Sequence, residues 1–377
     1  MPVNLLAPLT ADRFGEDALR RAHDEAARRG FVLRRTGRGD ERLAAWIDLH
    51  FGPSAWSSEA YAAEAWIGER DGRIAGFAAF DPRGLRFRWL RPWSARPAVG
   101  IFGPYGVLPQ HRKRGIGWVL STAALCALRA AGYESALIPA VDGERLIASY
   151  AERTGAAVAE EFSLDARPFR ATILASGAGT NARNVLERVA ARALPLDVRA
   201  VIVNRANAGA LRAAEDHGVR GVTVAWDRAT EQRAEYDARL IDAVARTEPE
   251  LVLLLGWMHL VPPAFLRRFP ETLNLHPAFL PLDPAADQVV APDGTIIPAL
   301  RGAHALRDAL RDGVAWTGAT VHAVTAATDR GRVLARVPVP VGDAVTEEQL
   351  RDAVRPIEFE TVAAAVRRWS FEQERAL

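Results

Sequence analysis

The feature that most limits the possible folds is a regular alternation of short apolar runs and helical stretches in the second half of the chain. The apolar runs are residues 171–175, 198–204, 222–225 and 251–255, and the helical stretches between them are residues 181–193, 208–217 and 230–246. Strands that alternate with helices of this length are typical of a parallel sheet with helices on both faces. We therefore expect a doubly wound, mostly parallel, Rossmann-like α/β domain, whose ligands bind beyond the carboxyl ends of the strands.

The first half of the chain follows a different pattern. Two strand-like runs, 65–69 and 73–80, are joined by Asp71-Gly72, a dipeptide typical of a two-residue hairpin turn. A further strand at 98–107 leads through a basic, glycine-containing turn into a helix at 118–131. This combination predicts a separate, mixed α/β domain.

A polar stretch with a proline, Ser163–Arg170, separates the two patterns. A chain of 377 residues is too long for one ordinary core, so two domains are the natural expectation. We place the boundary in this stretch, which gives domains at residues 1–165 and 168–377. Farther along, the insertion Leu282–Ala299 is rich in Pro, Asp and Gly, and we expect it to form a loop.

Composition excludes several classes of protein. The net charge is only +2, acidic residues are interspersed among the arginines, and Lys113 is the single lysine, so no basic block indicates a nucleic-acid partner. The single cysteine, Cys126, excludes a disulfide framework and a cysteine-based zinc site, and the eight histidines lack the spacing of metal ligands. The run Leu251–Trp257 is too short to span a membrane, and the N-terminus lacks a signal-peptide pattern. We expect a soluble cytoplasmic protein without a metal site and leave its oligomeric state open.

The basic turn of the first domain combines Arg112 and Arg114 with Gly115 and Gly117. Glycines let backbone N–H groups approach an anion closely, and the N-terminus of the following helix adds a positive dipole. The turn therefore fits a pyrophosphate group. The alternative is an ordinary basic turn on the surface.

Together with the hairpin and the segment 148–156, this turn makes residues 40–162 resemble the GNAT-type acyl-CoA N-acyltransferases. The resemblance implies the GNAT fold and a site for acetyl-CoA or another acyl-CoA, in which the turn binds the pyrophosphate. It also implies that Tyr150 protonates the departing thiolate. Packing of Tyr150 as an ordinary aromatic residue of its helix is an equal alternative. No residue identifies the acceptor of this domain.

The first loop of the second domain contains Gly177, Gly179, Thr180 and Asn181, and we call it the glycine loop. Its Gly-x-Gly spacing after a strand fits a dinucleotide-binding turn. An NAD site would need an acidic residue at the end of the next strand, where the sequence has Asn204-Arg205. An NADP site and a plain phosphate site at the helix start both stay open.

The segment Leu273–Pro277 carries the most informative chemistry. Alternation along a strand places Asn274 and His276 on one face. An asparagine amide can donate to a developing oxyanion, and a histidine can carry a proton near neutral pH. Asp329, in a later turn, can orient the histidine and stabilise its protonated form. Three such side chains predict a catalytic site for acyl-type transfer.

With these residues, the second domain resembles the phosphoribosylglycinamide formyltransferases. The shared motifs are Ser-Gly-x-Gly-Thr-Asn at 176–181, Asn274-x-His276-Pro, Gly302-x-His304 and Val321-His-x-Val-Thr-x-x-x-Asp329-x-Gly331. The resemblance implies 10-formyltetrahydrofolate as the formyl donor and an amine as the acceptor. It implies that Asn274 and His276 stabilise the tetrahedral intermediate and move protons, with Asp329 in support.

The same resemblance carries over further site residues. The glycine loop corresponds to the seat of the substrate phosphate, and Glu358 corresponds to a late substrate-binding glutamate. Arg355, one turn before Glu358, can add a charge-assisted bond to that phosphate. Met258 and Leu260 fall where the family lines its folate pocket. These positions predict an acceptor that bears a phosphate.

Several departures from the family pattern lie near the expected acceptor site. The family's Gly-Phe-Met-Arg is Gly256-Trp-Met-His259 here, its second histidine after His304 is Leu306, and its Gly-Gly after the aspartate is Arg330-Gly331. The insertion 282–299 falls in the same region. These changes leave formyl transfer intact and put the identity of the amine in doubt.

We therefore predict a folate-dependent N-formyltransferase for a small, phosphate-bearing amine, with an appended acetyltransferase-like domain that would make an active chain bifunctional. One alternative is a formyltransferase for an amine of specialised metabolism that the GNAT-like domain acetylates or recognises. A second is hydrolysis of the formylfolate by the same three residues. A third is an NADP-dependent oxidoreductase, which leaves Asn274, His276 and Asp329 unexplained.

Overall fold

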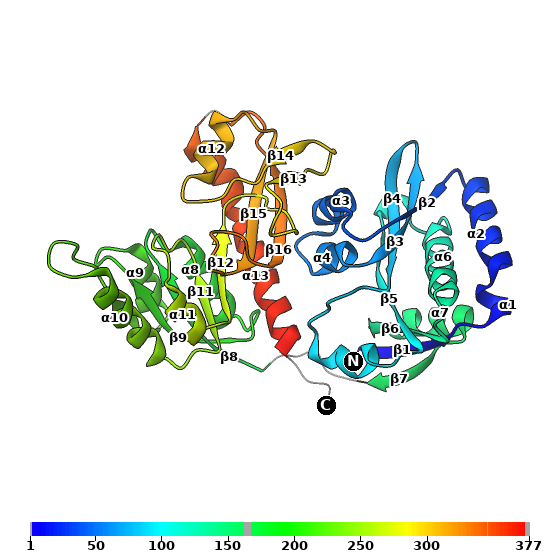
Figure 1. Cartoon of the computed structure of the whole chain (residues 1–377), viewed down its shortest axis with the longest axis horizontal. Coiled ribbons are helices and arrows are strands. Elements are labelled where there is room, and N and C mark those ends of the chain that lie inside the picture. Colours follow the sequence, from blue (N-terminus) through cyan, green and yellow to red (C-terminus); the bar gives the residue numbers. More distant parts are fainter. Residues whose placement is uncertain (1, 162–166, 345, 374–377) are drawn as a thin grey trace. The chain divides into compact units, whose positions relative to one another are not determined.

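The computed structural model of the protein describes residues 2–161, 167–344 and 346–373, which pack into two compact units (Figure 1). The first unit contains residues 2–44, 56–161 and 371–373, and the second contains residues 45–55, 167–344 and 346–370. Part of the expected linker Ser163–Arg170 lies outside the described residues, so the boundary at residues 165 and 168 stays a prediction.

The first unit is built on a seven-stranded mixed sheet in the order β2-β3-β4-β5-β6-β1-β7. Its strands are β1 (Val3–Pro8), β2 (Val32–Thr36), β3 (Glu64–Arg70), β4 (Arg73–Phe80), β5 (Val99–Val107), β6 (Ser135–Val141) and β7 (Ala157–Glu161). Its helices are α1 (Ala11–Phe14), α2 (Glu16–Arg28), α4 (Trp56–Tyr61), α5 (Arg91–Ser94), α6 (Ile116–Ala130) and α7 (Glu144–Thr154), with 3-10 turns at Arg88–Leu90 and Pro109–His111. Helix α3 (Glu41–Phe51) begins in the first unit and ends in the second.

The hairpin predicted at Asp71-Gly72 is confirmed. Strands β3 and β4 pair antiparallel, and both turn residues have a positive φ, 53° and 73°, as the favoured two-residue turn requires. Strand β5 pairs antiparallel with β4 and parallel with β6, and α6 follows it. This sequence of elements places the basic turn and its glycines at the N-terminus of α6.

The second unit is built on a seven-stranded sheet in the order β10-β9-β8-β11-β12-β15-β16. Its strands are β8 (Phe169–Ala175), β9 (Leu196–Val203), β10 (Gly221–Thr223), β11 (Leu251–Leu254), β12 (Thr272–His276), β15 (Trp316–Ala323) and β16 (Val333–Pro340). Strands β10 to β12 in this order are parallel, and β15 and β16 run antiparallel to their neighbours. The expectation of a doubly wound, mostly parallel sheet is confirmed.

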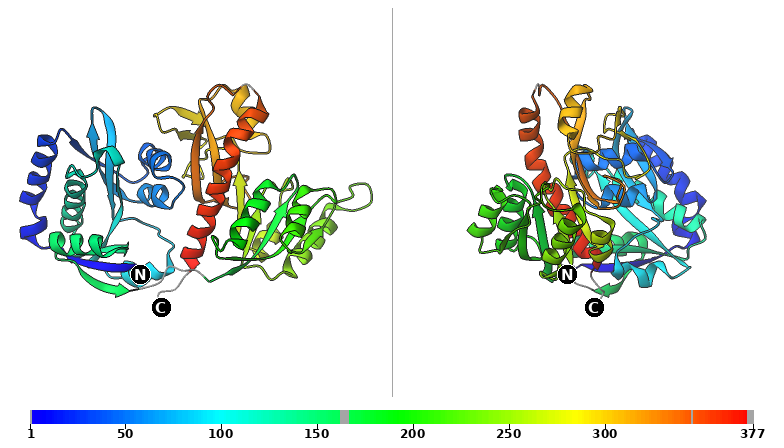
Figure 2. Two further views of the ribbon diagram at one scale, coloured as in Figure 1. Left: turned by 180° about the vertical axis from the view of Figure 1, so that it is seen from behind. Right: turned by 60° about the vertical axis from the view of Figure 1, so that its left-hand side comes forward.

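Helices cover this sheet on both faces (Figure 2). They are α8 (Thr180–Ala190), α9 (Gly209–Asp216), α10 (Arg233–Ala245), α11 (Pro263–Arg268), α12 (Ala305–Arg311) and α13 (Glu347–Gln373). Buried side chains of α8, α9, α12 and α13 join one apolar core, and those of α10 and α11 join another. Strands β8, β9 and β11 contribute buried side chains to both cores, which explains the apolar runs of the sequence at these strands.

The composition of the insertion Leu282–Ala299 predicted a loop, but the structure shows regular elements there. The insertion contains two short strands, β13 (Gln288–Val290) and β14 (Ile296–Pro298), which pair antiparallel. Val289 and Ile297 are buried against Phe279 in a small core of their own. Strands of three residues give too little alternation to be seen beside so many Pro, Asp and Gly residues. We call this element the inserted hairpin.

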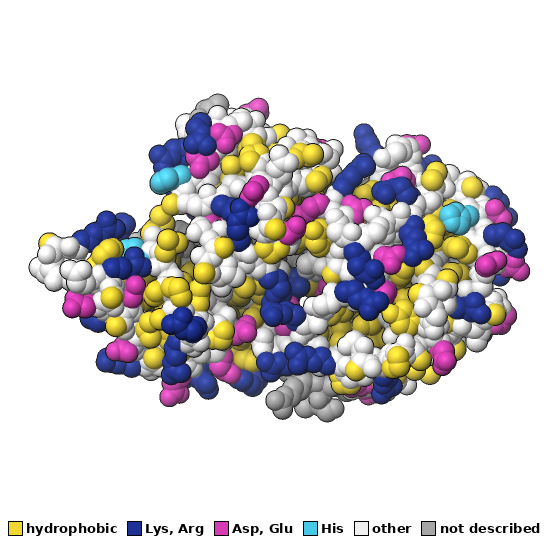
Figure 3. Space-filling view, viewed as in Figure 1, with side chains coloured by type: hydrophobic (Ala, Val, Ile, Leu, Met, Phe, Trp, Pro, Cys, Tyr) yellow, Lys and Arg dark blue, Asp and Glu magenta, His cyan; other side chains and the backbone are white. Residues whose placement is uncertain are grey.

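Basic and acidic side chains are scattered together over the face shown in Figure 3. Many of the arginines form ion pairs with nearby carboxylates, as Arg183 does with Asp216 at 2.7 Å. The 48 basic residues are nearly balanced by 46 acidic residues, which leaves a net charge of only +2. In the part of the chain that the structure describes, no helix has both the length and the apolar composition needed to cross a membrane.

Candidate functional site

Strand β12 places two of the predicted catalytic side chains at one edge of the second sheet. It is the last parallel strand, and its carboxyl end is His276. Asn274 lies opposite His322 of β15, and His276 lies opposite Thr320. Asn274 is half-buried and His276 is buried. Their positions two residues apart put both side chains on the same face of the strand, as predicted.

Asp329 lies in the turn between β15 and β16 and meets both of these side chains. Its Oδ2 is 3.5 Å from His276 Nδ1, and its Oδ1 accepts from Asn274 Nδ2 at 3.4 Å. The backbone N–H of Gly302 donates to Asp329 Oδ2 at 2.8 Å. The structure therefore brings together the three side chains that the sequence singled out.

A fourth polar residue, His322, belongs to the same cluster. Its Nε2 is 3.3 Å from Asp329 Oδ1 and 3.3 Å from Asn274 Nδ2. Its Nδ1 donates to the carbonyl of Ala323 at 2.9 Å. Sequence reasoning quoted His322 within a motif and gave it no role. No local signal could have assigned it one, because His322 lies opposite Asn274 only through the pairing of β12 with β15.

Burial and hydrogen bonding set the charges in this cluster. Burial alone would raise the pKa of Asp329, but the hydrogen bond from His322, the nearby His276 and the Gly302 N–H outweigh it and hold that pKa well below its usual value. Burial lowers the pKa of His276, and the charge of Asp329 only partly opposes this effect. At neutral pH the cluster therefore contains an ionised carboxylate beside a neutral imidazole.

A hydrogen bond fixes which nitrogen of His276 is basic. Its Nε2 lies 2.6 Å from the carbonyl oxygen of Leu300, which can only accept, so Nε2 carries the proton of the neutral ring. The lone pair is then on Nδ1, which faces Asp329 at 3.5 Å. A proton taken up at Nδ1 would lie next to the carboxylate that stabilises it.

The glycine loop and Glu358 form a second group at the same edge of the sheet. The loop connects β8 to α8, and Gly179, with φ of 78°, precedes the first residue of the helix. Asn181 Nδ2 donates to Glu358 Oε2 at 2.8 Å, which joins α8 to α13. Burial raises the pKa of Glu358, and Asn181 and Arg355 oppose the shift. The structure thus brings Asn181 of the glycine loop and Glu358 together, and their role in binding a substrate stays a prediction.

The remaining predicted residues of this unit have exposed side chains or an acidic partner. Arg355 forms an ion pair with Asp352 at 3.0 Å on the surface of α13. Met258 and Leu260 follow β11, and their side chains are 54% and 71% exposed. These two positions therefore offer apolar surface to a ligand beyond the end of the sheet.

Buried polar atoms without a partner accompany this apolar surface. Asn204 Oδ1 and Trp257 Nε1 are both buried and have no hydrogen-bond partner among the described residues. Asn204 Nδ2 lies 3.1 Å from His259 Nε2, and His259 Nδ1 lies 3.0 Å from the hydroxyl of Tyr236. Since buried polar groups are normally paired, an acceptor and a donor left open here fit a polar heteroaromatic ligand.

The first unit has a cavity of about 440 Å³ at the N-terminus of α6. Three cationic side chains line it, Arg29, Lys113 and Arg153, and the described lining residues include no acidic side chain. Gly115 and Gly117 contribute to the lining, and Gly115 has φ of 82°. Positive charge, open backbone and a helix N-terminus together fit a polyphosphate anion.

The structure assigns the charges around this cavity to other residues than the sequence suggested. Arg112 and Arg114 do not line it: Arg112 Nε donates to the carbonyl of Val107 at 3.0 Å, and the carbonyl of Arg114 accepts from Arg29 Nη1 at 2.6 Å. Arg29 lies at the end of α2, far away in sequence from the basic turn. No local pattern in the sequence could have indicated its place beside Gly115.

Tyr150 is both a core residue of the first unit and a lining residue of the cavity, and its catalytic role stays a prediction. Its ring packs edge-on against Phe102 at 6.4 Å. Burial, with a smaller contribution from Tyr105, raises the pKa of Tyr150 far above its usual value. The hydroxyl therefore keeps its proton at neutral pH and can act only as a donor or a neutral acceptor.

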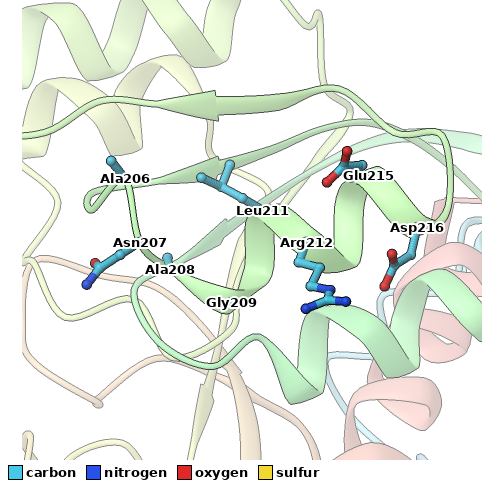
Figure 4. A pocket seen from close by; sticks show the side chains of 8 residues that line it. All are labelled: Ala206, Asn207, Ala208, Gly209, Leu211, Arg212, Glu215 and Asp216. Atoms are coloured by element: carbon cyan, nitrogen blue, oxygen red, sulfur yellow. The ribbon is translucent and has the colours of Figure 1, made fainter.

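A further hollow of about 760 Å³ lies beside α9 in the second unit (Figure 4). Its lining includes Asn207, Arg212, Glu215 and Asp216. None of the predicted catalytic or substrate residues lines it. Asp216 is already paired with Arg183, so this hollow carries no candidate chemistry.

Two family models match the chain. The model described as formyl transferase matches residues 169–366, and the model of the acetyltransferase (GNAT) family matches residues 17–156. A phosphoribosylglycinamide formyltransferase of Mycobacterium tuberculosis is 39% identical over 202 residues, which are 53% of this chain and 84% of that protein. The enzyme of the same name from Escherichia coli is 33% identical over 45% of this chain and 74% of its own length.

Solved structures of similarly named proteins also match. Glycinamide ribonucleotide transformylase 1 from Symbiobacterium toebii is 33% identical with a TM-score of 0.47 and covers 54% of this chain and 88% of that one. Phosphoribosylglycinamide formyltransferase from Bacillus halodurans is 27% identical with a TM-score of 0.46 and covers 53% of this chain and 94% of that one.

Proposed function

The chain belongs to the formyl transferase family, and from this premise we propose that its second unit transfers a formyl group from 10-formyltetrahydrofolate to the amine of a small, phosphate-bearing acceptor. One observation carries the proposal: Asn274, His276 and Asp329 meet at the carboxyl end of β12. The chain matches most of the length of two proteins named phosphoribosylglycinamide formyltransferase, and this similarity supports the same reaction type.

Each side chain of the cluster has a chemical role in this proposal. The half-buried amide of Asn274 donates to a carbonyl oxygen that gains negative charge when the amine attacks. His276 accepts the proton of the attacking amine at Nδ1, and Asp329 stabilises the imidazolium that results. The Gly302 N–H keeps Asp329 in place. A neutral histidine and an ionised aspartate are the protonation states that these roles require.

The donor supplies a formyl group that is already activated on a folate nitrogen. The residues present fit such a group: Met258 and Leu260 give exposed apolar surface, and Asn204 Oδ1 and Trp257 Nε1 are open polar contacts beside it. His259 holds the amide of Asn204 in place. These residues would bind and orient the flat ring of the donor.

The acceptor site of the proposal lies around the glycine loop. Backbone N–H groups at the start of α8 suit a phosphate, and Gly177 has no atom within 4 Å of the position where a Cβ would be. Glu358 is held by Asn181 and would accept from a hydroxyl or amine of the acceptor. Arg355 is one helical turn from Glu358 and adds positive charge on that side.

For the first unit we propose binding of acetyl-CoA or another acyl-CoA, with acyl transfer to an amine as a second activity. The match to the GNAT family and the cavity of about 440 Å³ with three cations support it. A Cβ at Gly115 would meet the guanidinium of Arg29 at 2.7 Å, so the glycine keeps this seat open. Tyr150, protonated and buried, would donate the proton to the departing thiolate.

Formyl transfer is tested with purified full-length protein, 10-formyltetrahydrofolate and a panel of amines with and without phosphoribosyl groups. Asn274→Ala and His276→Ala should each reduce turnover on the order of a hundredfold or more, because each removes a group that acts in the transition state. His217→Ala, at the half-buried C-cap of α9, is the matched control. Parental turnover in both variants, with unchanged circular dichroism, would show that the cluster is not catalytic.

Recognition of a phosphate is tested by competition. Inorganic phosphate should raise the KM for the amine without changing kcat, and Arg355→Ala should weaken this inhibition severalfold. Kinetics that phosphate leaves unchanged would mean that the glycine loop is only a tight turn. A parallel titration with NADPH separates transfer from the oxidoreductase alternative, and formate release without amine would indicate hydrolysis.

A further inference from the structure

The inserted hairpin is attached to the catalytic turn by two arginines. Asp287, at the start of the hairpin, accepts from Arg301 Nη1 at 3.2 Å and from Arg330 Nη2. Arg301 also donates from Nη2 to the carbonyl of Ala286 at 2.7 Å. Arg330 Nη1 donates to the carbonyl of Pro284 at 3.0 Å. One carboxylate and the backbone beside it therefore bind both guanidinium groups.

Both arginines are next to the groups that hold the catalytic residues. Arg301 Nε donates to the backbone carbonyl of Asp329 at 3.2 Å, and Arg330 follows Asp329 directly. The residues on either side of Arg301 act on the site itself: the carbonyl of Leu300 accepts from His276, and the N–H of Gly302 donates to Asp329. Through Arg301 and Arg330, the hairpin thus contacts both chain segments that support the cluster.

We propose that Asp287 of the inserted hairpin is a positioning residue, which fixes Arg301 and Arg330 so that the turn carrying Asp329 keeps its carboxylate against His276. The inference rests on the proposed formyl transfer for its kinetic consequence. It assigns a role to an insertion that had none, and it links that insertion to Arg330, one of the departures from the family pattern.

Backbone strain explains why the turn needs such support. Asp329 has φ of 52°, in the left-handed region that side chains other than glycine rarely adopt. Residues in this region keep their conformation only where the surroundings hold it. Gly331 cannot be replaced by a larger residue, because a Cβ there would collide with the carbonyl of Ala323. The turn is therefore tightly constrained on one side and held by the two arginines on the other.

The exposure of these groups makes the proposal testable without unfolding the protein. The side chain of Asp287 is 76% exposed, so its removal leaves no buried cavity. Arg301, only 13% exposed, keeps its bonds to the carbonyls of Ala286 and Asp329. Asp287→Ala should therefore fold and loosen the turn instead of releasing it completely.

Kinetics of the full-length protein give the first test. Asp287→Ala should reduce kcat between about tenfold and a hundredfold with the KM for both substrates nearly unchanged, because the loss is one of catalytic geometry. Asp287→Asn, which keeps shape and loses charge, should be intermediate. Asp283→Ala, an exposed carboxylate four residues earlier, is the matched control and should retain parental kcat. Parental kcat in Asp287→Ala, or an equal loss in Asp283→Ala, would overturn the proposal.

A second test does not depend on the reaction. The charged or polar groups that face His276 are Asp329, His322, Arg301 and the Leu300 carbonyl. NMR titration of ¹³C-labelled histidine, with the signal assigned by His276→Gln, should show a lower pKa of His276 in Asp287→Ala and in Asp329→Asn. In the double variant, the pKa of His276 should be no lower than in Asp329→Asn alone, because both changes act on the same contact. An unshifted signal in Asp287→Ala overturns the positioning role even if formyl transfer is confirmed. A shift in a protein that transfers no formyl group would instead disprove only the proposed reaction.

Discussion

At the scale of single residues, several donors converge on the carboxylate of Asp329. His322, Asn274 and the Gly302 N–H all lie within 3.4 Å of its oxygens. Their combined effect holds the pKa of Asp329 below the value of about 3.9 expected in the unfolded chain. The ionised carboxylate therefore stabilises the folded state above that unfolded pKa, and this contribution is lost as the pH falls through the lowered folded pKa.

The pH dependence of turnover follows from the same cluster. Because burial lowers the pKa of His276, Nδ1 is free to accept a proton at neutral pH, and kcat should fall only when the pH drops below that lowered pKa. Asp329→Asn removes the charge that opposes the shift, so the acid limb should move to still lower pH while the plateau rate falls. Profiles of kcat between pH 4 and 9, with pH-stable circular dichroism as a control, measure both effects. An acid limb that stays in place would mean that another group controls it.

The sequence could predict part of this cluster because part of it is local. Asn274 and His276 share a strand, and Asp329 follows a motif of fixed spacing. The contributions of His322 and Arg301 depend on pairing between β12 and β15 and on a bond across 28 residues. Periodicity does not contain such long-range contacts. The same holds for Arg29, which lines the cavity of the first unit from an unrelated helix.

At the scale of elements, the two glycines in the turn from β8 to α8 have different surroundings. Gly179 has φ of 78°, and a Cβ there would collide with the backbone of Ala210 in α9. Gly177 has open space around the same position. The two glycines of one motif therefore have different reasons to lack a side chain.

This difference predicts opposite outcomes for two matched variants. Gly179→Ala should destabilise the second unit by about 1–3 kcal/mol, because it combines backbone strain with a collision that α9 must relieve. Gly177→Ala should leave stability nearly unchanged and weaken binding of a phosphate-bearing amine. Thermal unfolding and phosphate inhibition constants measure the two effects separately. Equal melting temperatures of the two variants would contradict this division of roles.

The positions of strands were predictable where helices separate parallel strands, and less so elsewhere. The apolar runs that became β8, β9 and β11 were visible because each lies between two cores. The inserted hairpin was expected as a loop, since only Val289 and Ile297 of its short strands are buried. One buried residue in each three-residue strand is too weak a pattern to distinguish a hairpin from a loop.

At the scale of the whole molecule, the second unit is assembled from two separate stretches of chain. Residues 45–55 pack with residues 167–344 and 346–370, although 111 residues lie between residues 55 and 167 in the sequence. Within the second unit, Arg336 of β16 donates from Nε to Asp48 at 2.8 Å and from Nη1 to the carbonyl of Leu280 at 2.7 Å. Its guanidinium also stacks on Phe279 at 4.4 Å. A single cut near residue 168 would therefore remove part of the second unit.

The buried pair of Asp48 and Arg336 predicts how much residues 45–55 contribute to the stability of the second unit. Both side chains are at most 1% exposed, so Asp48→Ala removes a charge partner of a buried guanidinium. The second unit should lose about 3–5 kcal/mol of stability, as is typical when one member of a buried pair is removed. Replacing both members, Asp48→Leu with Arg336→Met, should recover much of the loss, because both charges of this pair are then removed together. Asp216→Ala, which breaks the exposed pair with Arg183, is the control and should change little.

Hydrogen exchange of the full-length protein measures the effect: the amides of β16 should lose protection in Asp48→Ala while those of β3 keep theirs. Equal protection of β16 in Asp48→Ala and in the parent would show that residues 45–55 add nothing to the stability of the second unit.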